Sequence, residues 1–147
     1  MPDQRVPQPG RLDAWSAHVI QVGRLPVVLL MNDASLYTLL VNAAGLTDFR
    51  SFVQILLISV RAVWSWHGVT FEAAEHPVVV FRRTNRSLMG SMNDAARCLR
   101  WHYDSSIEGS RPFDLAHVQG MLNEMPYKGI GYGCPKDRLA QLLAAEG

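Results

Sequence analysis

Helical periodicity in the middle of the 147-residue chain is the feature that most limits the folds open to it. Apolar residues recur at the i, i+3, i+4 and i+7 positions, which predicts an amphipathic helix from Asp48 to His67. Thr47 is a suitable N-cap and Gly68 a suitable stop. Further apolar residues widen the stripe, so we expect this helix to be central or to mediate self-association. The stripe consists of Phe49, Phe52, Val53, Leu56, Val60, Val63 and Trp64.

Short runs rich in β-branched residues lie on both sides of this helix. Residues 19–22 and 27–30 are two such runs, separated by the turn-forming sequence GRLP, and they predict a β-hairpin. A turn at Asn32–Asp33 followed by SLYTLLVN predicts a third strand. After the helix, HPVVVFRR predicts a fourth strand, in which Pro77 is tolerated only at the strand start or at a sheet edge.

Three shorter helices are predicted in the second half of the chain. The first runs from Ser91 to about His102, and the second runs from Asp114 to Glu124. Pro135 is expected to open the last one.

Strands followed by helices favour an α+β fold over a doubly wound sheet. We therefore expect a mostly antiparallel sheet of about four strands, packed against one long central helix and three shorter helices. Residues 14–147 should form this single domain, and the proline-bearing residues 1–13 should be a flexible leader.

The composition excludes several classes of protein. Hydrophobic residues make up 48% and charged residues 18%, as in a folded domain, and the net charge of +1 gives no global attraction to nucleic acid. The polar N-terminus predicts no signal peptide, and the longest apolar stretch is too short and too polar to span a membrane. The default expectation is a soluble, cytoplasmic protein of bacterial type.

Metal and cofactor sites are not indicated by residue spacing. The two cysteines, Cys98 and Cys134, are far apart, and the five histidines have no H-x-H or H-x-x-x-H spacing. No nucleotide-binding glycine motif is present, and GIGYG lacks the flanking sequence of one. We expect no metal and no cofactor, and we interpret Cys98 as a small core residue.

The segment TNRSLMGSMND, from Thr84 to Asp94, is the preferred functional site. Eight of its eleven residues are polar or glycine, and arginines are concentrated in and around it. Guanidinium groups, hydroxyls and the N–H groups of a helix start together can hold a phosphate or a carboxylate. We predict a binding or regulatory module whose corner here takes an anionic small molecule or a protein partner. The candidate ligand residues are Thr84, Asn85, Arg86, Ser87, Ser91, Asn93 and Asp94.

Other interpretations of this segment stay open. Ser91 and Asp94 have the S-x-x-D spacing of a capping box, which would give them a purely structural role. An enzyme is one alternative, a hydrolase or transferase acting on a phosphate-bearing substrate through Ser87, Asn93, Asp94 and an arginine.

Nucleic-acid binding is a second alternative, and self-association is a separate expectation. Trp101 could stack on a base beside phosphate contacts, although ordinary core roles explain it as well. A homodimer could form through the long helix or through an edge strand. The arginines available to nucleic acid are Arg82, Arg83, Arg97 and Arg100.

Two segments, TNRSLMGSMNDA and LNEMPYKGIGYGCPKDRLAQLL, resemble a family of short uncharacterised bacterial proteins that is described as a domain of unknown function. Its members carry a TN-x-RS-x-x-GSMND-like signature and a later LN-x-x-P…GY-x-x-P element. The likeness spans about Trp15 to Leu143, and this chain departs from the pattern in its shorter TNRS and in Ala95. The resemblance implies a shared site and no established chemistry. Beside the candidate residues above, it marks Gly90, Asn123, Pro126, Gly131, Tyr132 and Pro135.

Overall fold

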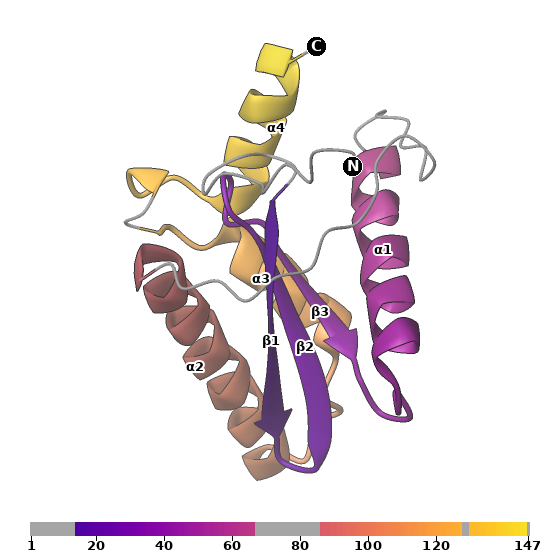
Figure 1. Cartoon of the computed structure of the whole chain (residues 1–147). Coiled ribbons are helices and arrows are strands. Elements are labelled where there is room, and N and C mark those ends of the chain that lie inside the picture. The colour runs from indigo at the N-terminus through magenta and orange to yellow at the C-terminus, as the bar shows by residue number, and fades with distance from the viewer. Residues whose placement is uncertain (1–13, 67–85, 128–129, 147) are drawn as a thin grey trace.

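The computed structural model describes residues 14–66, 86–127 and 130–146, and it confirms an α+β architecture. Within these residues, an antiparallel sheet of three strands in the order β1-β2-β3 lies among four helices (Figure 1). The fourth strand predicted at HPVVVFRR and the leader over residues 1–13 lie outside the described residues. In chain order the elements are β1 (Trp15–Val22), β2 (Leu25–Asn32), β3 (Thr38–Asn42), α1 (Phe49–Trp66), α2 (Arg86–Glu108), α3 (Leu115–Glu124) and α4 (Pro135–Glu146).

The predicted hairpin is confirmed as β1 and β2. Val22 pairs with Leu25, so a turn of two residues joins the strands. Gly23 has a φ of 61°, the left-handed conformation that the first position of such a turn requires. The predicted third strand is β3, which pairs with β2 in antiparallel register after the turn at Asn32 and Asp33.

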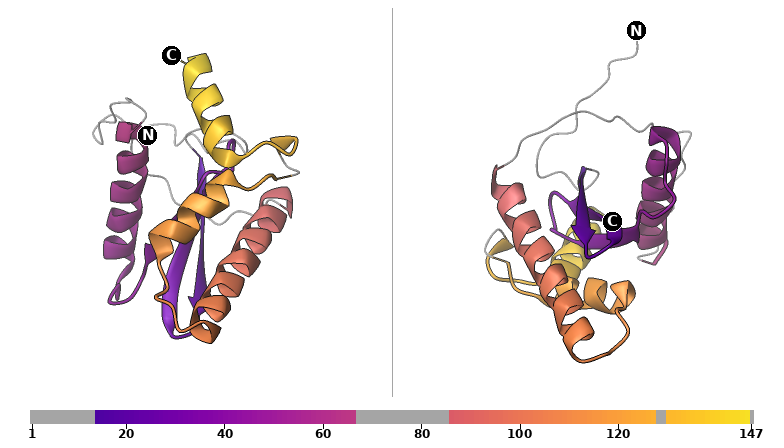
Figure 2. Two further views of the ribbon diagram at one scale, coloured as in Figure 1. Left: turned by 180° about the vertical axis from the view of Figure 1, so that it is seen from behind. Right: turned by 90° about the horizontal axis from the view of Figure 1, so that it is seen from below.

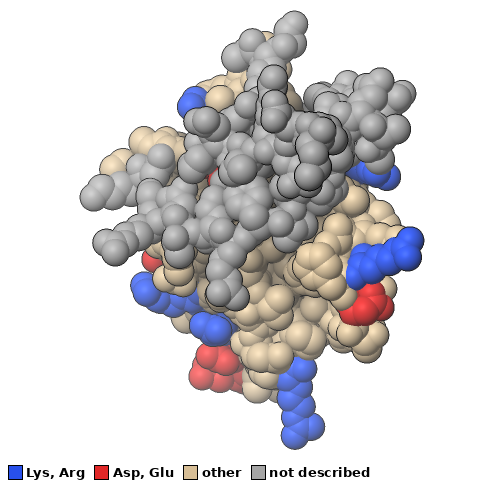
Figure 3. Space-filling view, viewed as in Figure 1, with Lys and Arg blue, Asp and Glu red and all other residues tan. Residues whose placement is uncertain are grey.

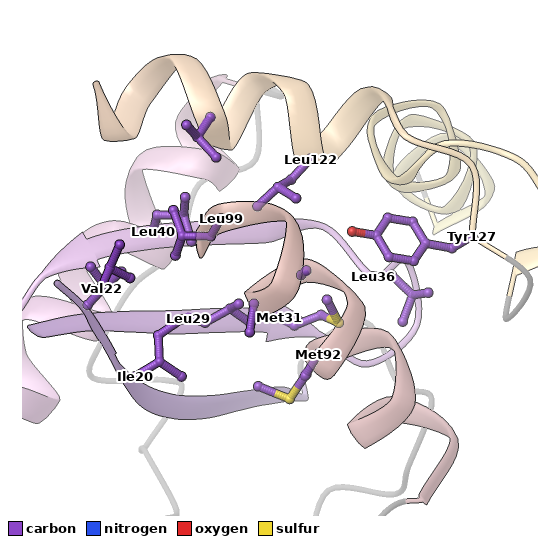
Figure 4. Close-up of a cluster of buried hydrophobic side chains, with 14 of the residues drawn as sticks. Ile20, Val22, Leu29, Met31, Leu36, Leu40, Met92, Leu99, Leu122 and Tyr127 are labelled. Carbon is purple, nitrogen blue, oxygen red and sulfur yellow. The ribbon is translucent and has the colours of Figure 1, made fainter. Parts of the chain in front are cut away.

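Both faces of the sheet are covered, which explains why β2 is a continuous apolar run. Successive side chains of a strand point to opposite faces. Leu29 and Met31 belong to the core formed with α2 and α3, whereas Leu30 belongs to a second core formed with α1 and α4. Figures 1 and 2 show α2 and α1 on opposite sides of the strands, and Figure 4 shows the first of these cores.

Helix α1 confirms the predicted helix to within about a residue at each end, but its central position is a correction. Only Val63 and Trp64 are buried, and Ile58 and Trp66 are 59% and 72% exposed. The second face of the sheet is shared with α4, so only one stripe of α1 meets the core. Its N-cap is Asp48 and not Thr47, because the Ser51 N–H donates to the Asp48 carboxylate at 2.7 Å.

Helix α2 is longer than predicted. It begins at Arg86 rather than at Ser91 and continues to Glu108, beyond the expected end near His102. The earlier start continues the apolar side of the helix, because Leu88 lies one turn before Met92 and both are buried in the first core. The 23-residue α2, and not α1, is therefore the longest of the described helices.

Helix α3 closes the outer edge of the sheet with two side-chain amides. Asn123 accepts from the backbone N–H of Thr38 at 2.7 Å and donates to the Thr38 carbonyl at 2.9 Å. One turn earlier, Gln119 accepts from the N–H of Leu40 at 2.9 Å. These amides satisfy backbone groups of β3 that an edge strand otherwise leaves unpaired. The predicted bounds of α3 and the start of α4 at Pro135 are confirmed.

Candidate functional site

The candidate residues at the start of α2 do not all share one environment. Thr84 and Asn85 lie outside the described residues, and so do the side chains of Arg86 and Ser87, although the backbone of these two forms the first turn of α2. Ser91 is buried against the body of the protein, whereas Asn93 and Asp94 are exposed.

The capping box predicted from Ser91 and Asp94 is wrong. Ser91 lies within α2, so its neighbouring N–H groups belong to the helix interior. The Asp94 carboxylate faces Arg97 at 3.8 Å in an exposed i,i+3 pair. A pair of this kind contributes little to stability. The polarity of GSMND therefore needs an explanation other than helix capping.

The residues of α2 divide into a buried side and an exposed side. One half of the helix packs into the first core, and the opposite half forms a surface that we call the α2 outer face. Asn93 and Asp94 belong to the α2 outer face, whereas Ser91 does not. The described residues of this face are Met89, Gly90, Asn93, Asp94, Arg97, Arg100, Trp101, Asp104, Ile107 and Glu108.

Gly90 is unusual within the α2 outer face. A glycine inside a helix is less favourable than alanine by about 1 kcal/mol, because its backbone loses more freedom on folding. A Cβ added at Gly90 would meet no described atom within 4 Å. Packing within the described chain therefore gives no reason for glycine at this position. Its neighbour Met89 is 47% exposed, which adds an apolar group to the same surface.

A turn rich in glycine follows α3 and packs beside the start of α2. Tyr127 anchors this turn, because it donates from its N–H to Gly133 and accepts from the N–H of Tyr132 at 2.9 Å. Its ring lies in the first core with Leu88 and Met92. Figures 1 and 2 show the turn next to the first residues of α2. The structure thus brings together the two motif segments that the sequence separates by about forty residues.

Tyr132 lies at the tip of this turn in a conformation that is rare for a side chain of its size. Its φ is 64°, its ring is 69% exposed, and Gly131 before it has a φ of 67°. A left-handed conformation costs a non-glycine residue about 1–2 kcal/mol. Because the ring is exposed, its burial does not offset the cost of this backbone conformation.

Several motif residues have structural roles. Asn123 ties α3 to β3, and the buried Pro135 opens α4. Asn32, in the segment shared with the family, accepts from Ala34 and Ser35 and shapes the connection between β2 and β3. The motif residues thus separate into a structural group and an exposed group. The exposed group is Gly90, Asn93, Asp94, Pro126, Gly131 and Tyr132.

The charge of the α2 outer face is mixed. Arg97 and Arg100 are exposed there, but Asp94, Asp104 and Glu108 are exposed as well. Figure 3 shows basic and acidic side chains interspersed over this part of the described surface. Arg82 and Arg83, the other arginines considered for nucleic acid, lie outside the described residues. The described surface therefore offers no concentrated positive charge to a phosphate backbone.

Two titratable groups lie behind this surface: Cys98, which the sequence predicts to be a small core residue, and Tyr127, for which it predicts no role. Tyr127 is buried, and within the described part of the chain its hydroxyl has no hydrogen-bond partner. Burial raises its pKa well above the usual range for tyrosine, and the charges of Cys98 and Asp94 raise it further. Burial also raises the pKa of Cys98, which makes it a weak nucleophile. Only three-dimensional packing brings these two residues into one core, because they lie far apart in the sequence.

Within residues 14–66, 86–127 and 130–146, no group of three or more His, Cys, Asp or Glu side chains could hold a metal ion. Across the same residues, no helix is long and apolar enough to cross a membrane.

The fold and site define a small α+β domain with helices on both faces of a three-stranded sheet and an exposed helix surface beside a glycine-rich turn. The chain belongs to the family described as Domain of unknown function (DUF6933), which matches residues 1–138. This membership confirms the resemblance to an uncharacterised family. No curated protein and no solved structure matched the chain.

Proposed function

We propose that this protein is a binding module that docks a protein partner on the α2 outer face around Gly90, with the adjoining Gly131–Tyr132 turn. The observation that carries the proposal is Gly90, a glycine in a helix interior whose missing side chain leaves open space at the surface. Such a glycine allows the backbone of another chain to approach closely.

The groups around Gly90 suit a docking surface. Met89 supplies an exposed apolar group, and Asn93, one turn later, supplies an amide that can donate and accept. Tyr132 presents an exposed ring from the neighbouring turn, and tyrosine is among the residues that contribute most at protein interfaces. Because the charge of the face is mixed, recognition by shape and hydrogen bonding is favoured over a purely electrostatic attraction.

Gly120 offers a matched control for Gly90. It also lies inside a helix, in α3, and a Cβ there would also meet no described atom within 4 Å. We expect Gly90→Ala and Gly120→Ala each to raise the free energy of unfolding by about 1 kcal/mol. Chemical denaturation measures this. A docking role predicts that only the bulky variant Gly90→Arg, and not Gly120→Arg, interferes with a partner.

Photocrosslinking in cells that naturally produce the protein tests the docking surface. A photoreactive residue replacing Asn93 should give a discrete adduct, and one replacing His117, which is exposed one turn before Gly120, should not. Gly90→Arg should abolish the Asn93 adduct, and Gly120→Arg should leave it intact. An adduct that survives Gly90→Arg would contradict the proposal.

An anionic small molecule is the other ligand predicted for this corner, and inorganic phosphate is the probe for it. The first N–H groups of α2 belong to residues 86 and 87, and a helix start favours bound anions. Phosphate should shift the amide resonances of these residues in the wild type. Arg86→Ala should remove the shifts with little change in melting temperature. If Arg86→Ala lost much stability and the wild type showed no response to phosphate, a structural role for this corner would be favoured.

The surroundings of Asp94 support binding over catalysis. A hydrolase or transferase needs Asn93 or Asp94 to converge with a histidine or another carboxylate. Instead, these two side chains lie on the exposed side of a helix, and Asp94 has an ion pair with Arg97.

A gel-shift experiment at low salt tests the nucleic-acid alternative, because binding through phosphate contacts is strongest at low salt. A negative result under this condition would exclude it.

A further inference from the structure

Two sulfur atoms from distant parts of the chain lie in contact behind the α2 outer face. The Cys98 thiol donates to the Met125 thioether, and their sulfur atoms are 3.6 Å apart. Cys98 lies in α2, and Met125 follows the last residue of α3. Both side chains are half-buried and pack against the first core, so the packing of α2 against α3 keeps the pair together.

We propose that Cys98 and Met125 are ligands of a soft monovalent metal ion, Cu(I), and that Tyr127 donates a hydrogen bond to the Cys98 thiolate in the metal-bound protein. Thiolate and thioether sulfurs are the ligands that Cu(I) prefers, whereas Zn(II) takes thiolate, imidazole and carboxylate. This site is independent of the proposed partner surface, because neither sulfur residue belongs to the group around Gly90.

The spacing of the sulfur atoms is compatible with bonds from both of them to one metal ion. With metal–sulfur bonds of about 2.3 Å, sulfurs 3.6 Å apart subtend an angle of about 100° at the metal. This angle is closer to that of a three-coordinate ion than to a linear one, so the pair would supply two of three donors. In the binding step Cu(I) replaces the thiol proton. The proton leaves to solvent, a copper–sulfur bond forms, and no atom changes oxidation state.

The hydroxyl of Tyr127 is the second observation that points to a ligand here. Tyr127 is only 4% exposed, yet its hydroxyl has no hydrogen-bond partner among the described residues. A buried polar group in this state is unfavourable and calls for an explanation. Figure 4 shows the hydroxyl pointing inward from the loop, toward α2, which carries Cys98.

A metal-bound thiolate would give the Tyr127 hydroxyl its missing acceptor. Tyr127 is buried in the first core, and Cys98 packs against that same core. A tyrosine hydroxyl is a hydrogen-bond donor and can therefore serve a thiolate acceptor. A hydrogen bond to a ligand atom orients the ligand and tunes its affinity for the metal.

The experiment uses Cu(I) as the probe, added without oxygen to the reduced full-length protein in competition with the chromogenic chelator bicinchoninate. The wild type should withdraw about one equivalent per chain. Cys98→Ser should lose this ability, and Met125→Leu should weaken it. The matched controls are Cys134→Ser, which removes the other half-buried free thiol, and Met121→Leu, and both should behave as wild type. No withdrawal by the wild type, or an equal loss in Cys134→Ser, would overturn the proposal.

Tyr127→Phe separates the metal role from core packing. Removing an unpaired buried hydroxyl should leave the melting temperature of the copper-free protein unchanged or higher. Cu(I) affinity should nevertheless fall about tenfold. A residue that serves packing alone would leave Cu(I) affinity unchanged, and that result would overturn the role assigned to Tyr127.

Discussion

At the scale of single residues, Gly23 is required for two separate reasons. Its φ of 61° belongs to the left-handed region, and an added Cβ would overlap the ring of Tyr103 on α2. The ring cannot easily withdraw, because Phe113 packs against it edge-to-face with centroids 5.3 Å apart. The hairpin turn is thus fitted directly against the long helix.

Gly45 provides the control that separates these two requirements. It also has a positive φ, of 84°, but an added Cβ there would meet no described atom within 4 Å. We expect Gly45→Ala to lower the free energy of unfolding by about 1–2 kcal/mol through backbone strain alone. Gly23→Ala should lose about 1–3 kcal/mol more, because the Tyr103 ring must shift. Urea denaturation compares the two, and equal losses would exclude the steric contribution.

At the scale of elements, the side-chain amides of α3 hold the edge of the sheet. Asn123→Ala leaves the buried N–H and carbonyl of Thr38 without partners, so the free energy of unfolding should fall by about 2–4 kcal/mol. Gln119→Ala removes one bond to a partly buried group and should cost about 1 kcal/mol. The exposed neighbour Glu124→Ala is the control. If Asn123→Ala matched it in equilibrium unfolding, the edge contact would carry no stability.

The start of α1 should respond to acid. The Ser51 N–H and hydroxyl donate to the Asp48 carboxylate and lower its pKa below the usual value for aspartate. The contribution to stability is therefore complete above the unfolded-state pKa, about 3.9, and is lost as pH falls through the lower folded-state value. The Ser51 amide resonance should report fraying of α1 in this acidic range. Asp48→Asn should show no such transition, and identical titrations of the two proteins would contradict this assignment.

At the scale of the whole molecule, α1 leaves an apolar surface at the periphery. Ile58 and Trp66 are exposed two turns apart on the side that faces away from the sheet. Self-association through this helix is the prediction that the sequence made from its broad stripe, and it remains a prediction. If it holds, light scattering should give a dimer for the wild type and a monomer for Ile58→Asp, with similar circular dichroism. A monomeric wild type at high concentration would refute it.

The parts of this protein that local pattern determines could be predicted from the sequence. The hairpin, the third strand, α1, α3 and the start of α4 follow from apolar periodicity and from turn residues, which act over a few neighbouring positions. Where α2 begins could not be predicted, because the S-x-x-D spacing at Ser91 and Asp94 imitates a cap. Burial of Leu88 and Met92 in the core instead favours a helix that starts earlier.

Only the tertiary structure decided what depends on contacts between distant residues. Helix α1 is peripheral because it shares one face of the sheet with α4. The apolar stripe of α1 does not by itself indicate that a second helix covers the same face. The amide of Asn123 meets Thr38 across 85 residues, and the Cys98 and Met125 sulfurs meet across 27. In the candidate site, the sequence identified a polar segment but could not tell which of its residues are buried. Packing alone separated the buried Ser91 from the exposed Gly90 and Asn93, because burial is set by what lies opposite a helix and not by the helix itself.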